Sequence, residues 1–82
     1  DSMKNAGIFS GDILVVDRSL DPKDGSVVIA VIDGELTVKR LHRESNKIYL
    51  LPENNNYQPI EITEAMGFEV WGVVRTVIHS VM

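Results

Sequence analysis

Lys39 is the residue whose chemistry depends most on where the chain places it. It lies in the segment ELTVKRL at 35–41, where strand alternation puts it on one face with Thr37 and Leu41. The neighbouring segment 27–32 is apolar on both faces, so we expect it to be covered on both sides and Lys39 to be buried with it. Burial lowers a lysine pKa, and a neutral amine can act as a general base. The same pattern also fits an edge lysine whose stem covers apolar surface while its ammonium reaches water, which local sequence favours because buried lysine is rare.

A base of this kind needs a nucleophile, and Ser2 offers a hydroxyl. Its position beside Asp1 near the chain start equally suits a helix N-cap, so the residue alone assigns no role. His42 and His79 are the usual partners of a serine, but neither stands in a Ser-His-Asp pattern. We expect both histidines at the surface or at an interface. Their spacing matches no metal site and there is no cysteine, so we predict no metal and no cofactor.

The elements that must position these residues are short and rich in β-branched side chains. Alternating or apolar runs predict strands at 13–16, 26–32, 35–41, 47–51, 60–62 and 68–81. Asp33-Gly34 is the preferred pair for a type I′ hairpin turn, and Gly72 suggests a bulge in the last strand. A short helical turn fits residues 2–6. The sequence therefore predicts an all-β domain of six or seven mostly antiparallel strands with little helix.

Composition limits the classes of function. The 82 residues allow one small domain, 1–82, with net charge −4 and a pI of about 4.9. Without clustered Lys and Arg, we expect no direct nucleic-acid binding, and Trp71 is then a core or interface residue. The longest apolar run, 27–32, is too short to span a membrane. The lack of cysteine fits a cytoplasmic location.

Five stretches, taken in order, resemble the LexA/UmuD-type self-cleaving serine–lysine peptidases. Asp1-Ser2-Met3 matches the nucleophile motif Gly-Asp-Ser-Met without its glycine, and Lys39 follows Ser2 by 37 residues, the interval that this family uses. The remaining stretches are GDILVVD at 11–17, DGSVVIA at 24–30 continuing through 33–41, LPEN at 51–54 with YQPI at 57–60, and WGVV at 71–74. The likeness covers nearly the whole chain.

The resemblance implies a small β fold of the LexA and signal-peptidase type and a serine peptidase. Ser2 matches the nucleophile and Lys39 the general base, which reverses the local interpretation of Lys39. The backbone amides of Ser2 and Asp1 match the oxyanion hole. The substrate implied is the protein's own chain, at an Ala-Gly or Cys-Gly bond before the serine. Because the sequence opens at Asp1 without Met, we expect a fragment that lacks an N-terminal arm or DNA-binding domain.

Two branches of the family fit. The ending 68–79 looks more UmuD-like, which implies an SOS-response protein that joins an error-prone DNA polymerase after cleavage promoted by a recombinase–single-strand DNA filament. A LexA-like repressor domain is the alternative, and a signal-peptidase relative is a weaker one. We also expect a homodimer, because the long apolar strand at 70–81, near the chain end, is predicted to form a sheet edge that pairs with its own copy.

Overall fold

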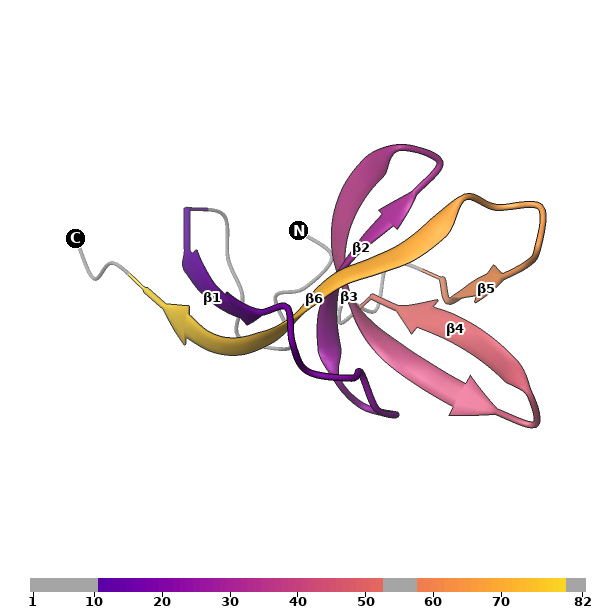
Figure 1. The fold of residues 1–82 in the computed structure, drawn as a ribbon, viewed down its shortest axis with the longest axis horizontal. Coiled ribbons are helices and arrows are strands. Elements are labelled where there is room, and N and C mark those ends of the chain that lie inside the picture. Colours follow the sequence, from indigo (N-terminus) through magenta and orange to yellow (C-terminus); the bar gives the residue numbers. More distant parts are fainter. Residues whose placement is uncertain (1–10, 53–57, 80–82) are drawn as a thin grey trace.

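The computed structural model describes residues 11–52 and 58–79. Within these ranges the chain forms six strands and no helix, which confirms the predicted all-β class. The strands are β1 (Ile13–Asp17), β2 (Val27–Ile32), β3 (Glu35–Glu44), β4 (Lys47–Leu51), β5 (Ile60–Ile62) and β6 (Phe68–Ile78) (Figure 1). The helical turn predicted at 2–6 lies outside the described residues, and so do Asp1 and Ser2.

The strands form one antiparallel sheet in the order β1-β6-β2-β3-β4-β5. The last strand is therefore internal, and the prediction that it forms a sheet edge is wrong. Its first half, from Phe68 to Val73, pairs with β2, and its second half, from Val73 to Ile78, pairs with β1. Figure 1 shows β6 running across the molecule with β1 beside its C-terminal half.

The β2–β3 hairpin turns at Asp33 and Gly34, as predicted. Both residues have positive φ, 49° and 85°, which is the requirement of a type I′ turn. The Asp33 carboxylate also accepts a hydrogen bond from the Gly67 N–H at 3.0 Å, and the Asp33 N–H donates to the Gly67 carbonyl at 3.0 Å. These bonds fasten the turn to the loop that leads into β6.

The two faces of the sheet differ in burial, because side chains alternate along each strand. We call the more buried side the core face. Its fully enclosed residues are Val28, Ala30, Leu41 and Leu50, and Ile32, Ile48, Ile62, Phe68, Val70 and Val73 pack against them. On the opposite side, the outer face, Ile29, Val31 and Val38 are only half-buried and Leu36 is exposed. The expectation that β2 is covered on both sides is thus correct for one face only.

The bulge predicted at Gly72 is present in β6. Ile29 pairs with Gly72 and Ala30 pairs with Val70, which leaves Trp71 as the extra residue. Gly72 is buried, and a side chain there would collide with the Cγ1 atom of Val16. The absence of a Cβ therefore lets the end of β1 lie directly on the bulge.

Candidate active site

Lys39 lies on the core face of the sheet. In the antiparallel register it pairs with Val28, and paired residues project to the same side. Thr37 lies two residues before Lys39 on β3, and the buried Leu41 lies two residues after it. Both therefore share the face of Lys39. The side chain of Lys39 is half-buried. An amine is thus placed beside the apolar core rather than on the solvent side of the strand.

This location changes the protonation behaviour of the amine. Desolvation by burial lowers the pKa of Lys39 below its usual value, because loss of water destabilises the charged ammonium more than the neutral amine. The Nζ atom donates a hydrogen bond to the Val38 carbonyl at 3.3 Å. A lysine with a lowered pKa supplies more neutral amine near neutral pH, which is what a general base requires.

A groove of about 560 Å³ opens beside Lys39. It is large enough to receive a few residues of extended peptide. Apolar side chains from β2, β3 and β5 form much of its wall, and Asp33 of the hairpin turn also lines it. The lining residues are Ile32, Asp33, Glu35, Leu36, Thr37, Lys39 and Ile60. The arrangement places a candidate base at the wall of a partly apolar cleft.

The predicted nucleophile Ser2 and the predicted oxyanion donors Asp1 and Ser2 lie outside the described residues. Their distances from Lys39 are therefore not part of the described geometry, and their roles stay predictions. Of the catalytic residues expected from the sequence, Lys39 is the one that the described ranges contain.

Both histidines are partly exposed at the surface, as expected, and each lies beside a carboxylate. His42 shares β3 with Lys39 but has the opposite parity, so it projects from the outer face. Its Nδ1 atom is 3.0 Å from the Asp24 carboxylate, and its Nε2 atom is 3.6 Å from that of Glu44. His79 has its Nδ1 atom 2.9 Å from the carboxylate of Asp12.

Asp24 ties the turn before β2 to the C-terminal half of β3. Its carboxylate accepts a hydrogen bond from the Arg43 N–H at 3.0 Å and contacts His42. These two contacts hold the pKa of Asp24 below its usual value. No local pattern predicts this pairing, since the partners are 18 and 19 residues apart. Within residues 11–52 and 58–79, no cluster of three or more His, Asp or Glu side chains could hold a metal ion.

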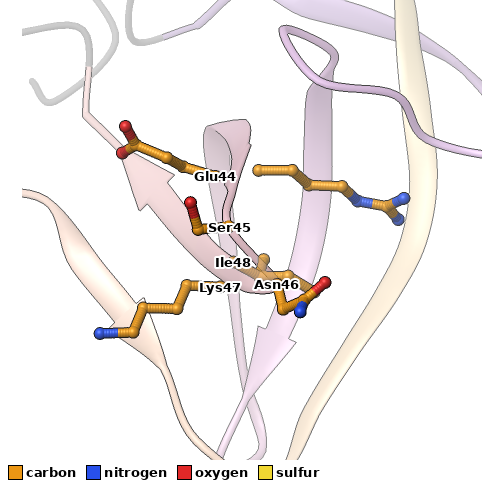
Figure 2. Close-up of a pocket in the computed structure, with 6 residues that line it drawn as sticks. Glu44, Ser45, Asn46, Lys47 and Ile48 are labelled. Atoms are coloured by element: carbon orange, nitrogen blue, oxygen red, sulfur yellow. The ribbon is translucent and has the colours of Figure 1, made fainter.

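A second hollow, of about 390 Å³, lies at the β3–β4 hairpin. Figure 2 shows that the side chains of Glu44 and Lys47, which pair across the Ser45-Asn46 turn, extend to the same side of the hairpin. Both turn residues have positive φ, as a tight hairpin requires. None of the residues predicted to be catalytic lines this hollow.

Comparison with known protein families identifies the class of protein to which this chain belongs. The family model described as Peptidase S24-like matches residues 1–75 of this chain, which includes both Ser2 and Lys39. The chain belongs to this family, which is one of serine peptidases with a LexA/UmuD-type self-cleaving fold. In the part of the chain that the structure describes, there is no helix with the length and apolar character needed to cross a membrane.

Proposed function

We propose that this chain is the self-cleaving serine–lysine peptidase domain of an SOS-response protein of the UmuD type, acting in the cytoplasm. The observation that carries the proposal is the position of Lys39 on the core face, at the wall of a groove, with its pKa lowered by desolvation. A serine–lysine pair needs a desolvated amine in this setting, because a protonated lysine cannot accept the serine proton.

In the proposed first step, the neutral amine of Lys39 takes the hydroxyl proton of Ser2. The Ser2 Oγ atom then attacks the carbonyl carbon of the scissile bond and forms a tetrahedral oxyanion. The backbone N–H groups of Ser2 and Asp1 donate hydrogen bonds to that oxyanion, provided that a peptide bond precedes Asp1. Lys39 now carries the proton as an ammonium.

Collapse of the tetrahedral intermediate breaks the C–N bond. The Lys39 ammonium returns its proton to the leaving amine, and the acyl group stays on Ser2 as an ester. A water molecule then attacks the ester while Lys39 accepts its proton. When the C–O bond breaks, the Lys39 ammonium returns that proton to the Ser2 Oγ atom, and the carboxylic acid product leaves and ionises. The groove beside Lys39 is the proposed binding place for the cleavage segment, whose small residues at an Ala-Gly or Cys-Gly bond allow close approach.

After cleavage, the domain is proposed to serve as a homodimeric subunit of an error-prone translesion DNA polymerase. A recombinase–single-strand DNA filament is the proposed promoter of cleavage. The net charge of −4 supports contact with DNA through a partner protein rather than directly. The competing proposal is a LexA-like repressor domain, which the family match leaves equally open.

The peptidase proposal is tested with the chain extended at its N-terminus by a segment that contains an Ala-Gly bond. Self-cleavage is followed by gel electrophoresis in the parent, Ser2→Ala, Lys39→Ala and Lys47→Ala chains. We expect cleavage to be lost in the first two variants. It should persist in Lys47→Ala, which removes an exposed lysine from β4. Cleavage at the parental rate in Lys39→Ala would end the proposal.

The branch within the family is tested separately by binding. We expect the cleaved domain to retain a Y-family polymerase on an affinity column and to leave duplex DNA unshifted in an electrophoretic assay. A domain that ignores the polymerase, but represses transcription when it is fused to a DNA-binding domain, supports the repressor alternative.

A further inference from the structure

The groove beside Lys39 lies where two strands of the sheet are not joined. β4 pairs with β3 only along residues 40–44, so the first half of β3, residues 35–39, extends past it. Among the described strands, β5 pairs with β4 alone. The groove is lined by Thr37 and Lys39 from the first half of β3 and by Ile60 from β5. No pairing between described strands therefore sets the distance between these two walls.

A loop at 63–67 provides a second connection between the walls. It leads from β5 to β6, and Figure 1 shows it turning back toward the start of β6. Within the loop, the Met66 N–H donates a hydrogen bond to the Thr63 carbonyl at 3.1 Å. Phe68, directly after the loop, pairs with Ile32, directly before the hairpin turn. The loop thus returns the chain from the end of β5 to the tip of the β2–β3 hairpin.

Asp33 fastens this loop to the hairpin tip. Its N–H donates to the Gly67 carbonyl, and its carboxylate accepts a hydrogen bond from the Gly67 N–H, both at 3.0 Å. The first bond joins two backbone groups, but the second needs an acceptor on the side chain. The contact closes a ring of β3, β4, β5 and the loop 63–67, to which Lys39 and Ile60 both belong. The two walls of the groove are thereby held from both ends.

The identity of residue 33 meets two requirements at once. Its φ of 49° is positive, and its side chain accepts the bond from Gly67. Glycine would satisfy the turn alone, whereas aspartate and asparagine tolerate this backbone conformation and also carry an acceptor. A Cβ atom on Gly67 would lie 3.7 Å from the Asp33 carboxylate, so the two segments are in close contact. The turn and the contact can therefore be separated by substitution.

We propose that Asp33 is a positioning residue of the groove: by holding Gly67, it fixes β5 relative to the first half of β3 and presets the width of the groove for the cleavage segment. The inference rests on the proposed function, which makes this groove the binding place of that segment. Asp33 acts through Gly67 and takes no part in proton transfer. A preset groove loses less conformational entropy when the segment binds, so the contact favours binding rather than the chemical step.

Two variants of Asp33 separate the bond from the turn. Asp33→Gly keeps a turn sequence that suits type I′ but removes the acceptor. Asp33→Asn keeps the turn and the acceptor, because its amide oxygen can take the same bond. Glu64→Gln is the matched control, since it removes a negative charge from an exposed position of the same loop. Each chain carries one residue before Asp1, so that the Asp1 N–H is an amide, and receives a fluorescent peptide that contains an Ala-Gly bond.

Binding and cleavage are measured separately. Fluorescence anisotropy in the Ser2→Ala background gives the Kd of the peptide, and the chains with Ser2 intact give KM and kcat. Asp33→Gly should raise Kd and KM about three- to tenfold, as expected for loss of one hydrogen bond. Its kcat should stay within about twofold of the parent, because the chemical step is untouched. Asp33→Asn should recover the affinity, and Glu64→Gln should leave all three values unchanged.

Amide hydrogen exchange, followed by NMR, reports the contact itself. The Gly67 N–H should exchange faster in Asp33→Gly than in the parent and be protected again in Asp33→Asn. The Leu41 N–H, which donates to the Ser26 carbonyl at 2.8 Å, should keep its protection in every variant. This second amide shows whether the rest of β3 is intact.

The outcomes distinguish this role from the proposed function. A parent that neither cleaves its own extended segment nor binds the peptide overturns both. If the parent cleaves its own segment but does not bind the peptide, the groove is not preset and the role of Asp33 fails alone. That role also fails if Asp33→Gly has the parental Kd and KM, or if Asp33→Asn binds as weakly as Asp33→Gly. Loss of kcat as large as the loss of affinity, or loss of protection at Leu41, would make Asp33 a general structural residue and contradict positioning.

Discussion

Lys39 and His42 stand three residues apart on β3, yet the strand gives them opposite environments. Lys39 projects to the core face, where desolvation lowers its pKa. His42 projects to the outer face, where the carboxylates of Asp24 and Glu44 lie 3.0 and 3.6 Å from its ring nitrogens. The fold removes water from one basic group and surrounds the other with acceptors. Strand parity, more than residue type, therefore decides which of the two bases is suited to take a proton from a substrate.

The largest expected effect comes from moving the amine across the strand. The double variant Val38→Lys/Lys39→Val keeps the composition but transfers the amine to the outer face. Self-cleavage of the extended chain should fall by about 10²- to 10⁴-fold, the contribution of a positioned general base. Circular dichroism should show the β structure retained. Cleavage within tenfold of the parent rate would mean that the face of the strand is irrelevant.

The next largest effect is expected on the free energy of unfolding, when a leucine is truncated on one face of the sheet or the other. Leu50 is fully buried on the core face and Leu36 is 69% exposed on the outer face. Leu50→Ala should lower the free energy of unfolding by about 2–5 kcal/mol. Leu36→Ala, measured as a monomer, should change it by less than about 0.5 kcal/mol. Urea unfolding of both variants measures the difference, and equal losses would contradict the assignment of the core.

A carboxylate placed beside Lys39 should make its environment more like that of His42. Thr37 shares the core face with Lys39, so Thr37→Asp adds an opposite charge that raises the pKa of the amine. The cleavage rate should rise with pH in both proteins as the amine loses its proton, with the midpoint displaced upward by about one pH unit in the variant. Thr37→Asn is the isosteric control and should leave the midpoint in place. An unchanged midpoint in Thr37→Asp would argue against Lys39 as the titrating base.

The smallest effect is expected on the pH dependence of stability, through Asp24, which contacts His42. The pKa of Asp24 is lowered in the folded chain by the Arg43 N–H and by His42, so the folded state binds fewer protons there than the unfolded chain. Its stabilising contribution is present above the unfolded pKa, about 3.9, and is lost as pH falls through the lower folded value. Asp24→Asn should therefore flatten the acid limb of stability against pH.

Thermal unfolding between pH 2 and 7 measures this limb. Asp21→Asn, at an exposed position in the same turn, is the matched control. If both variants follow the parent curve, the Asp24 contacts add nothing to the pH dependence.

Local pattern predicted the strands and the hairpin because both depend on neighbours in sequence. Asp33-Gly34 specifies its own backbone geometry, and alternation around Lys39 placed it on the same side as Leu41. Strand limits were less accurate. β3 continues to Glu44 rather than 41, since β4 pairs with it to the end, and β6 ends at Ile78, with residues 80–82 outside the described ranges.

Contacts between distant segments could not be predicted in this way. The insertion of β6 between β1 and β2 depends on pairing with partners 36 to 65 residues away in the sequence, which leaves no periodic signal. For the same reason, nothing in the sequence linked Asp33 to Gly67 or Asp24 to His42. The family resemblance, not local pattern, assigned a catalytic role to Lys39, and the register then showed why that position suits one.

The two-residue turn at Asp33 and Gly34 has a consequence for how this chain can change in evolution. It sets the pairing of Lys39 with Val28, and a slip of one residue would exchange the faces of every side chain on β3. A single codon gained or lost at this tip would therefore exchange Lys39 for Val38 beside the groove. Surface hairpins usually tolerate changes of length, but here the proposed enzyme would be silenced without any substitution of a catalytic residue.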